Sequence, residues 1–222
     1  MNSLGKFSIT PQESLSFARA SGDYNPLHLD PVAARRTRFG HTLIHGVCGS
    51  IRALDLLLRR RGSCSTLARI KVKYNKPATQ GQELEAFEQT TDGVTRIELY
   101  ADGTRCQTID LEFAQSPPPS LPGAAGFSIC DADPELPLDL SIEDCNSLSG
   151  SVALGWDEAL MASLFPDATR HLAPAQLAVL LASTRIVGMK CPGLHSVFAR
   201  LEVDFQAPVP SAAAGGNASL AY

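Results

Sequence analysis

Long hydrophobic runs are missing from this chain, and none approaches the roughly 18–20 apolar residues that a membrane-spanning helix needs. A basic surplus is also missing, because 19 lysines and arginines stand against 23 acidic residues. Binding to phosphate usually requires a basic balance, so we do not expect a nucleic acid as a partner. The lack of a spanning apolar run likewise leads us to expect no membrane partner. The start, MNSLGKFSIT, lacks the basic and then apolar layout of a signal peptide, which predicts a cytoplasmic protein.

Paired cysteines are absent as well. The six cysteines are scattered singly, none forms a Cys-x-x-Cys motif, and none stands at a zinc spacing from a histidine. We interpret them as reduced thiols, mostly small core residues, and we expect no metal site.

What the sequence does contain is enough apolar material for a sizeable core, at 44% of 222 residues. A short strand-like stretch is followed by a helix start at Thr10-Pro11, and the region 21–40 is rich in turn residues. Apolar residues spaced three and four apart then predict a long helix from about Thr42 to Arg61, which Gly62 can end.

Four strands are predicted after this helix, at about 66–75, 84–90, 94–101 and 104–113. Asp92-Gly93 and Asp102-Gly103 stand between the last three, and Asp-Gly is a strong signal for a two-residue hairpin. The first half of the chain is therefore expected to be a long helix followed by an antiparallel sheet.

The second half repeats this pattern. The alternating stretch from Leu67 to Tyr74 aligns with the stretch from Phe198 to Phe205, and an apolar helix is predicted at 172–187. We predict two units, 1–115 and 127–222, joined by a linker rich in Pro and Gly at 116–126. The second unit contains only two of the four strands, so it is either abbreviated or part of a longer protein.

The two equivalent strands carry opposite charges. Arg69, Lys71 and Lys73 alternate in one, and Glu202 and Asp204 alternate in the other. Such charges favour pairing across neighbouring strands, so we expect strands 66–75 and 197–206 to pair antiparallel within one chain, as an intramolecular pseudo-dimer.

The chemistry is concentrated in the loop 21–40 and at the start of the long helix. Asp23 and His28 stand five apart in a loop shaped by Gly and Pro, where a carboxylate and an imidazole can share one water as an acid–base pair. Asn25 stands between them and can orient the loop or the water. Gly46 lies in the first helical turn, where free N–H groups and the helix dipole can stabilise an oxyanion.

The string from Ser21 to His28, with Phe17 before it and Ala34 after it, closely resembles the signature of the MaoC-like, (R)-specific enoyl-CoA hydratase family. Phe39 and His45-Gly46 fit the later part of that signature. The resemblance implies an α+β hotdog fold, in which an antiparallel sheet wraps around a long central helix. Two such units pair, either as separate chains or as a fused double hotdog.

The resemblance further implies that Asp23 and His28 activate the water that adds to a trans-2-enoyl thioester, with Asn25 supporting the water. The N–H of Gly46 would receive the thioester oxygen. The substrate would be carried by CoA or an acyl carrier protein, with no metal or redox cofactor, and a higher homo-oligomer is left open. We interpret the remaining histidines as structural or exposed, namely His41, His45, His171 and His195.

The second half lacks the motif, since Gln176 and Leu177 stand where the first half has His45-Gly46. We therefore expect it to be non-catalytic and to complete the sheet and shape the acyl tunnel. Four leucines of its helix are interpreted either as an acyl lining or as plain core: Leu172, Leu177, Leu180 and Leu181.

Two other functions compete with the hydratase. One is a hotdog module that binds acyl thioesters without turnover. The other is a hotdog thioesterase, which places its carboxylate on the central helix, where Asp55 is the candidate.

Overall fold

The computed structural model describes residues 1–62, 66–114, 127, 135–205 and 218–222. The first half contains β1 (Asn2–Phe7), α1 (Pro11–Ser21), α2 (Pro26–Leu29), α3 (Pro31–Arg35), α4 (Gly46–Arg61), β2 (Leu67–Tyr74), β3 (Leu84–Thr91), β4 (Val94–Ala101) and β5 (Thr104–Phe113). The second half contains α5 (Ile142–Ser147), β6 (Ser151–Ala153), α6 (Glu158–Leu164), α7 (Pro166–His171), α8 (Pro174–Arg185), the π-helix η1 (Ile186–Lys190), β7 (Arg200–Asp204) and β8 (Ser219–Ala221).

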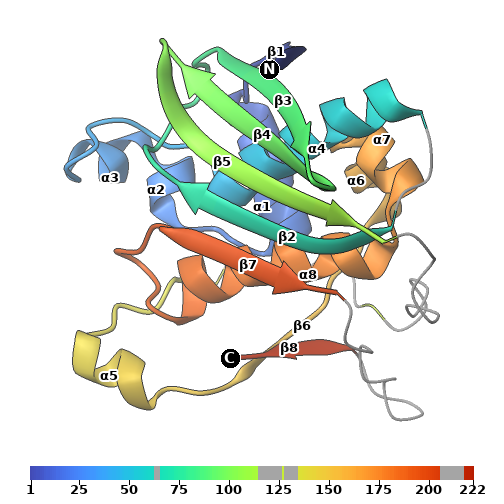
Figure 1. Ribbon diagram of the computed structural model, residues 1–222. Helices are drawn as coiled ribbons and strands as arrows, with labels where there is room; N and C mark the ends of the chain where they lie inside the picture. Colours follow the sequence, from blue (N-terminus) through green and yellow to red (C-terminus); the bar gives the residue numbers. More distant parts are fainter. Residues whose placement is uncertain (63–65, 115–126, 128–134, 206–217) are drawn as a thin grey trace.

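An antiparallel sheet of six strands, in the order β1-β3-β4-β5-β2-β7, curves over the central helix α4 (Figure 1). The four strands predicted after the long helix are present as β2 to β5. A curved antiparallel sheet around one long helix is the hotdog arrangement, and the expected α+β class is confirmed.

Helix α4 begins at Gly46, four residues later than its apolar spacing predicts. The preceding residues are extended instead, because Leu43 forms a bridge with Thr79 and the N–H of Ile44 donates to the carbonyl of Ala78 at 3.0 Å. The predicted end is confirmed, since Gly62 adopts the left-handed conformation with φ +62° and caps the helix.

The two Asp-Gly hairpins form as predicted. Asp92 and Gly93 have φ of 51° and 81°, and Asp102 and Gly103 have φ of 48° and 70°. Positive φ at both central residues is the backbone conformation of the tight hairpin turn whose twist matches that of the paired strands.

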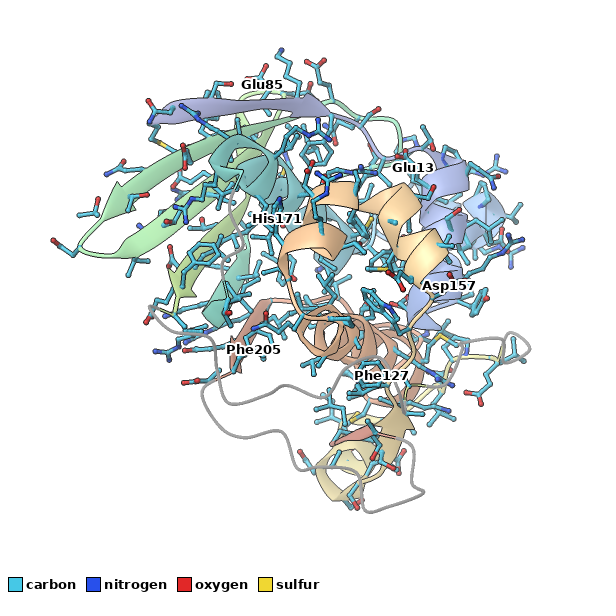
Figure 2. All side chains as sticks on the ribbon, turned by 90° about the vertical axis from the view of Figure 1, so that its right-hand side faces the viewer. Glu13, Glu85, Phe127, Asp157, His171 and Phe205 are labelled. Atoms are coloured by element: carbon cyan, nitrogen blue, oxygen red, sulfur yellow. The ribbon has the colours of Figure 1, made fainter. Side chains whose placement is uncertain are left out.

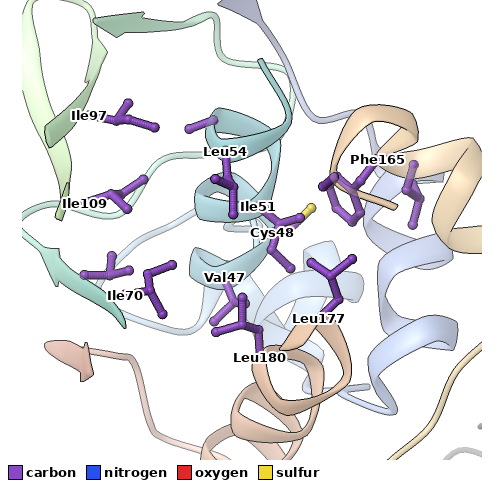
Figure 3. Close-up of a cluster of buried hydrophobic side chains, with 14 of the residues drawn as sticks. Val47, Cys48, Ile51, Leu54, Ile70, Ile97, Ile109, Phe165, Leu177 and Leu180 are labelled. Atoms are coloured by element: carbon purple, nitrogen blue, oxygen red, sulfur yellow. The ribbon is translucent and has the colours of Figure 1, made fainter. Parts of the chain in front are cut away.

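The core lies on both sides of α4. Figure 3 shows Ile70, Ile97 and Ile109 of the sheet on one side of this helix, with Phe165 and Leu177 on the other. The side view in Figure 2 shows the same layers, with the sheet on one side and the helices of the second half on the other. Both halves of the chain therefore share one apolar core.

Strand β7 extends the sheet by pairing antiparallel with β2, as the charge pattern predicts. Arg69 is opposite Asp204 and Lys71 is opposite Glu202 in this register, and the guanidinium of Arg69 contacts the carboxylate of Glu202. The short strands β6 and β8 form a separate sheet of two strands. The linker 116–126 lies outside the described residues, so the division into two units stays a prediction.

The second half contains helices that the sequence pattern did not predict. Residues 142–147 form α5, and α6 and α7 follow before α8. The four leucines left open between acyl lining and core are 0–5% exposed and belong to the core: Leu172, Leu177, Leu180 and Leu181. None of the four is among the residues that line the pocket described below, which favours the interpretation as core.

Two of the cysteines, Cys64 and Cys130, lie outside the described residues. The cysteines within them are free, with Cys48 and Cys106 buried as expected. No helix in the described part of the chain is both long enough and apolar enough to cross a membrane.

Candidate active site

The loop after α1 folds as its sequence dictates. Gly22 ends α1 in the left-handed conformation, with φ +75°, and its N–H bonds the carbonyl of Ala18 at 2.7 Å. The hydroxyl of Ser21 donates to the carbonyl of Phe17 and accepts the N–H of Asp23. The chain therefore turns sharply at Gly22 and directs Asp23 away from the axis of α1.

Asn25 starts the next helix. Its side-chain oxygen accepts the N–H of Leu27 at 3.0 Å, and Pro26 occupies the first helical position, where a missing N–H costs nothing. His28 lies in this one-turn helix, so the corner between α1 and α2 places the carboxylate of Asp23 and the imidazole of His28 close together.

Asp23, His28 and His45 form one cluster. One side-chain ligand atom from each residue lies within 4.8 Å of the other two, which is a separation that one water can bridge. The rings of His28 and His45 stack with centroids 3.9 Å apart, and Phe17 packs against His45 with centroids 5.0 Å apart. The structure thus brings the two predicted acid–base residues together.

Hydrogen bonds to backbone carbonyls decide which nitrogen of each imidazole carries the proton. Nδ1 of His28 lies 3.0 Å from the carbonyl oxygen of Leu43, and a carbonyl can only accept. Nδ1 of His28 is therefore the protonated nitrogen, which leaves a lone pair on Nε2. This nitrogen is the one able to accept a proton from water.

His45 belongs to the site, although the sequence suggested only a structural role. It is 1% exposed, its Nε2 donates to the carbonyl of Asp23 at 3.0 Å, and this nitrogen lies 4.0 Å from Oδ2 of Asp23. The available sequence signal was its place directly before Gly46, at the start of α4. Its contact supports both the backbone and the ring stack of the acid–base pair.

Burial determines the protonation of the cluster. It raises the pKa of Asp23, while the charge of His28 and hydrogen bonds from Thr184 and Asn25 lower that pKa in part. Burial lowers the pKa of His28, partly against the charge of Asp23, and lowers the pKa of His45 well below its ordinary value of 6.5. Both imidazoles are therefore neutral near pH 7, and His28 is available as a base.

Gly46 is the first residue of α4, where an N–H has no acceptor within its own helix. A Cβ at this position would lie 2.7 Å from Cε1 of Tyr74, so the close tyrosine ring requires glycine here. The carbonyl of Gly46 accepts from Gln107 at 3.0 Å, which fixes the first turn. Its position at a helix N-terminus suits it to an anionic oxygen.

The side chain of Asn25 is fully engaged with the protein. Its amide nitrogen donates to the carbonyls of Gly188, Gly193 and Leu194, at 3.0, 3.3 and 3.2 Å. Of the two roles expected for Asn25, this geometry favours orienting the loop over supporting a water. The loop of the first half that contains Asp23 and His28 is thus attached to the backbone of the second half.

A pocket of about 270 Å³ opens beside the cluster. The first half contributes Asp23, His28 and Gly46 to its lining, and the second half contributes Thr184 and Gly188. The remaining lining residues include apolar side chains from both halves: Phe39, Leu43, Ile44, Pro77, Val187, Val197 and Phe198. The lining therefore combines an acid–base cluster with an apolar wall from two separate parts of the chain.

The same three residues are the only group among the described residues with the composition and spacing of a metal site. The nitrogen of His45 that faces Asp23 carries its proton, because it donates to a backbone carbonyl. A protonated nitrogen cannot ligate a metal, so the arrangement suits proton transfer better than coordination.

Comparison with known proteins agrees with this geometry. Residues 5–105 match the model of the MaoC like domain. This part of the chain is similar to a MaoC like domain. It contains α1, α2, α4 and the loop with Asp23 and His28, so the matched region includes every predicted site residue.

Two relatives match the same region. The chain is 31% identical over 99 residues to peroxisomal multifunctional enzyme type 2 of Drosophila melanogaster, which covers 43% of this chain and 14% of that protein. It is 41% identical over 76 residues to peroxisomal hydratase-dehydrogenase-epimerase of Saccharomyces cerevisiae. This match covers 34% of this chain and 8% of that protein. The match thus spans a small part of these longer proteins.

The structural likeness extends beyond residues 5–105. A solved structure described as MaoC-like dehydratase aligns with 95% of this chain and 82% of its own, with a TM-score of 0.59 and 15% sequence identity. At this identity the likeness shows the fold alone. The structural alignment includes the second half of the chain, which the family model does not match.

Proposed function

We propose that the chain is a hydro-lyase that reversibly adds water to trans-2-enoyl thioesters of CoA or of an acyl carrier protein, giving (R)-3-hydroxyacyl thioesters. The observation that carries this proposal is the acid–base pair Asp23 and His28 at a pocket whose lining includes Gly46, the first residue of a helix. An enoyl thioester needs both features, a base for water and a donor for its carbonyl oxygen.

The reaction follows from the positions of these groups. Nε2 of His28 accepts a proton from a water that Asp23 also holds, while the water oxygen bonds to C3 of the enoyl group. The π electrons move toward the thioester oxygen, which the N–H of Gly46 stabilises. The acid–base pair then returns one proton to C2, so the product gains one water and the pair recovers its starting protonation.

The relatives support this proposal through their names. One is a hydratase-dehydrogenase-epimerase, and the structural neighbour over most of the chain is a MaoC-like dehydratase. Addition of water to a double bond balances without a redox partner, and we propose that the reaction uses no metal or redox cofactor. We further propose that the two halves act as a pseudo-dimer with one active site, in the first half.

A hydration assay tests the proposal. The purified chain is mixed with crotonyl-CoA, the loss of absorbance at the enoyl band is followed, and the chirality of the product is determined. Asp23→Asn and His28→Ala are each expected to lower turnover by at least about 100-fold, the low end for acid–base residues. His41→Ala is the matched control, because it removes an exposed imidazole outside the pocket lining.

Near-wild-type turnover in either pocket variant would overturn the assignment of the acid–base pair. Tight binding of acyl thioesters without turnover by the unaltered chain would instead identify a binding module. Release of free thiol would indicate a thioesterase, but Asp55 is 0% exposed and absent from the pocket lining. Its Oδ1 accepts the N–H groups of Asp167 and Ala168, both at 2.8 Å, which is a structural task.

A further inference from the structure

The carboxylate of Asp23 is held by a helix that belongs to the second half of the chain. The hydroxyl of Thr184, on α8, donates to Oδ2 of Asp23 at 2.7 Å. Thr184 is 2% exposed and Asp23 is 1% exposed, so water does not compete freely for this bond. A hydrogen bond between a buried hydroxyl and a buried carboxylate belongs to the strong class.

The carboxylate also lies close to the segment that directly follows α8. Directly after α8 the backbone widens into the π-helix 186–190, a type of turn that is frequent at functional sites. Gly188 lies there, and a Cβ at this position would come within 2.3 Å of Oδ1 of Asp23. The absence of a side chain at Gly188 thus lets the carboxylate lie close to the backbone four residues beyond Thr184.

Each oxygen of Asp23 has an assigned partner. Oδ1 accepts the N–H of Asn25 at 3.2 Å, and Oδ2 accepts the hydroxyl of Thr184. The titratable groups facing the carboxylate are His28 and His45, while the nearby Arg185 lies against Gly22 and is 3.8 Å from Glu135. Because a carboxylate oxygen has two lone pairs, both oxygens can still accept a bond from water.

We propose that Thr184 is a positioning residue, whose hydroxyl fixes the carboxylate of Asp23 in the orientation from which Asp23 and His28 act together on water. This inference rests on the proposed function and extends it, because it assigns part of the acid–base machinery to the half that lacks the motif. Thr184 acts through Asp23 and takes no proton itself. A hydroxyl that only filled space in the core would leave the protonation of Asp23 unchanged.

The decisive variant is Thr184→Val, which keeps the branched shape and removes the hydroxyl. Loss of a donor to a carboxylate favours its protonated form, so we expect the acid limb of the pH profile of kcat/KM to move up by about one pH unit. We expect kcat for crotonyl-CoA to fall by about tenfold or more, with KM changed less than about threefold. Thr184→Ser, which keeps a hydroxyl, should restore most of the activity and the original acid limb.

Ser183→Ala is the matched control on the same helix. Its hydroxyl donates to the carbonyl of Leu180 at 2.7 Å, so its removal should leave the acid limb in place. If Thr184→Val unfolds, Thr184→Cys serves as the second variant, with a weaker donor of similar size, and should shift the acid limb in the same direction.

A direct titration separates this inference from the proposed function. Carbon-13 NMR of protein labelled at aspartate carboxyls follows Asp23, assigned by its loss in Asp23→Asn, and the titration should move to higher pH in Thr184→Val. If the unaltered chain hydrates no enoyl thioester, the proposed function fails, while this titration still tests the contact. An unchanged titration and acid limb in Thr184→Val, or an equal shift in Ser183→Ala, would overturn the role of Thr184.

Discussion

Most residues of the short segment from Ser21 to His28 have an identifiable structural or chemical role. Ser21 and Gly22 end one helix, Asn25 and Pro26 start the next, and the carboxylate of Asp23 and the imidazole of His28 meet at the corner between them. These local tasks can be predicted from the sequence, because caps and turns depend on neighbouring residues.

Long-range contacts at the same residues could not be predicted in this way. The bond from Thr184 to Asp23 and the bonds from Asn25 to the carbonyls of 188, 193 and 194 join residues more than 160 positions apart. Backbone carbonyls leave no signature in a sequence, and one threonine in an apolar helix does not stand out. The role of His45 was missed for a similar reason, because its partner is the main chain of Asp23.

Asn25→Asp is a test at the residue scale. An aspartate keeps the cap of α2 but replaces a donor with an acceptor that faces three carbonyls. We expect the free energy of unfolding to fall by at least about 2 kcal/mol, because buried acceptors lose their partner and like partial charges meet. Urea unfolding followed by circular dichroism measures this.

Asn146→Asp is the control for Asn25→Asp, since Asn146 is exposed in α5. It should unfold at nearly the urea concentration of the unaltered chain. Equal stability of the two variants would show that the amide of Asn25 does not hold the halves together.

Among the elements, α4 carries the main connection between the two halves besides the sheet. Asp55 on this helix accepts two N–H groups at the start of α7, and Arg59 one turn later binds the carboxylate of Asp167 at 2.9 Å. These contacts occupy the buried carboxylate that had been a candidate for thioesterase chemistry.

Asp55→Ala and Asp55→Asn form a matched pair at this scale. Alanine leaves two buried N–H groups without an acceptor, so we expect a loss of about 2–5 kcal/mol in unfolding free energy, against about 1 kcal/mol for asparagine, which retains an acceptor. Urea denaturation measures both, and hydration by the folded Asp55→Asn should stay within about twofold of the unaltered chain. Similar losses in both variants would contradict the capping role.

The elements differ in how well the sequence predicts them. The hairpin predictions were correct because positive φ at Asp-Gly is a local preference. The pairing of β7 with β2 could be predicted because the charges of the two strands complement each other. The start of α4 was wrong because Ile44 fits the apolar helical spacing while its backbone bonds Ala78. Helices α6 and α7 were not predicted, although Asp157 and Pro166 are ordinary start signals.

At the scale of the whole molecule, the buried histidines make stability depend on pH. The pKa of His45 is lowered well below 6.5 and that of His28 is also lowered, so the unfolded chain binds more protons than the folded chain below pH 6.5. Their contribution to stability is complete above that pH and is lost as the pH falls. The raised pKa of Asp23 acts in the opposite direction, because the folded chain takes up that proton more readily.

We therefore expect the free energy of unfolding to fall between pH 7 and pH 5.5, by up to about 1.4 kcal/mol per pH unit for each histidine, and the urea midpoint to fall with it. His45→Gln removes one titrating group and should flatten this dependence. Asp23→Asn removes the opposing group and a charge that favours protonated His28, so it should steepen the dependence. A midpoint that rises on acidification would contradict the assignment of buried neutral imidazoles.

The attachment of Asn25 to main-chain carbonyls also affects how this protein can change over evolutionary time. Every residue type carries a carbonyl, so mutations can replace side chains at most positions of 186–194 and still leave Asn25 its acceptors. Two glycines are exceptions, since a Cβ at Gly188 would strike Asp23 and a Cβ at Gly193 would lie 2.0 Å from the carbonyl oxygen of Leu138. The segment 186–194 can thus vary at many of its side chains while these two glycines stay constrained, and a segment without family signature can continue to support the site.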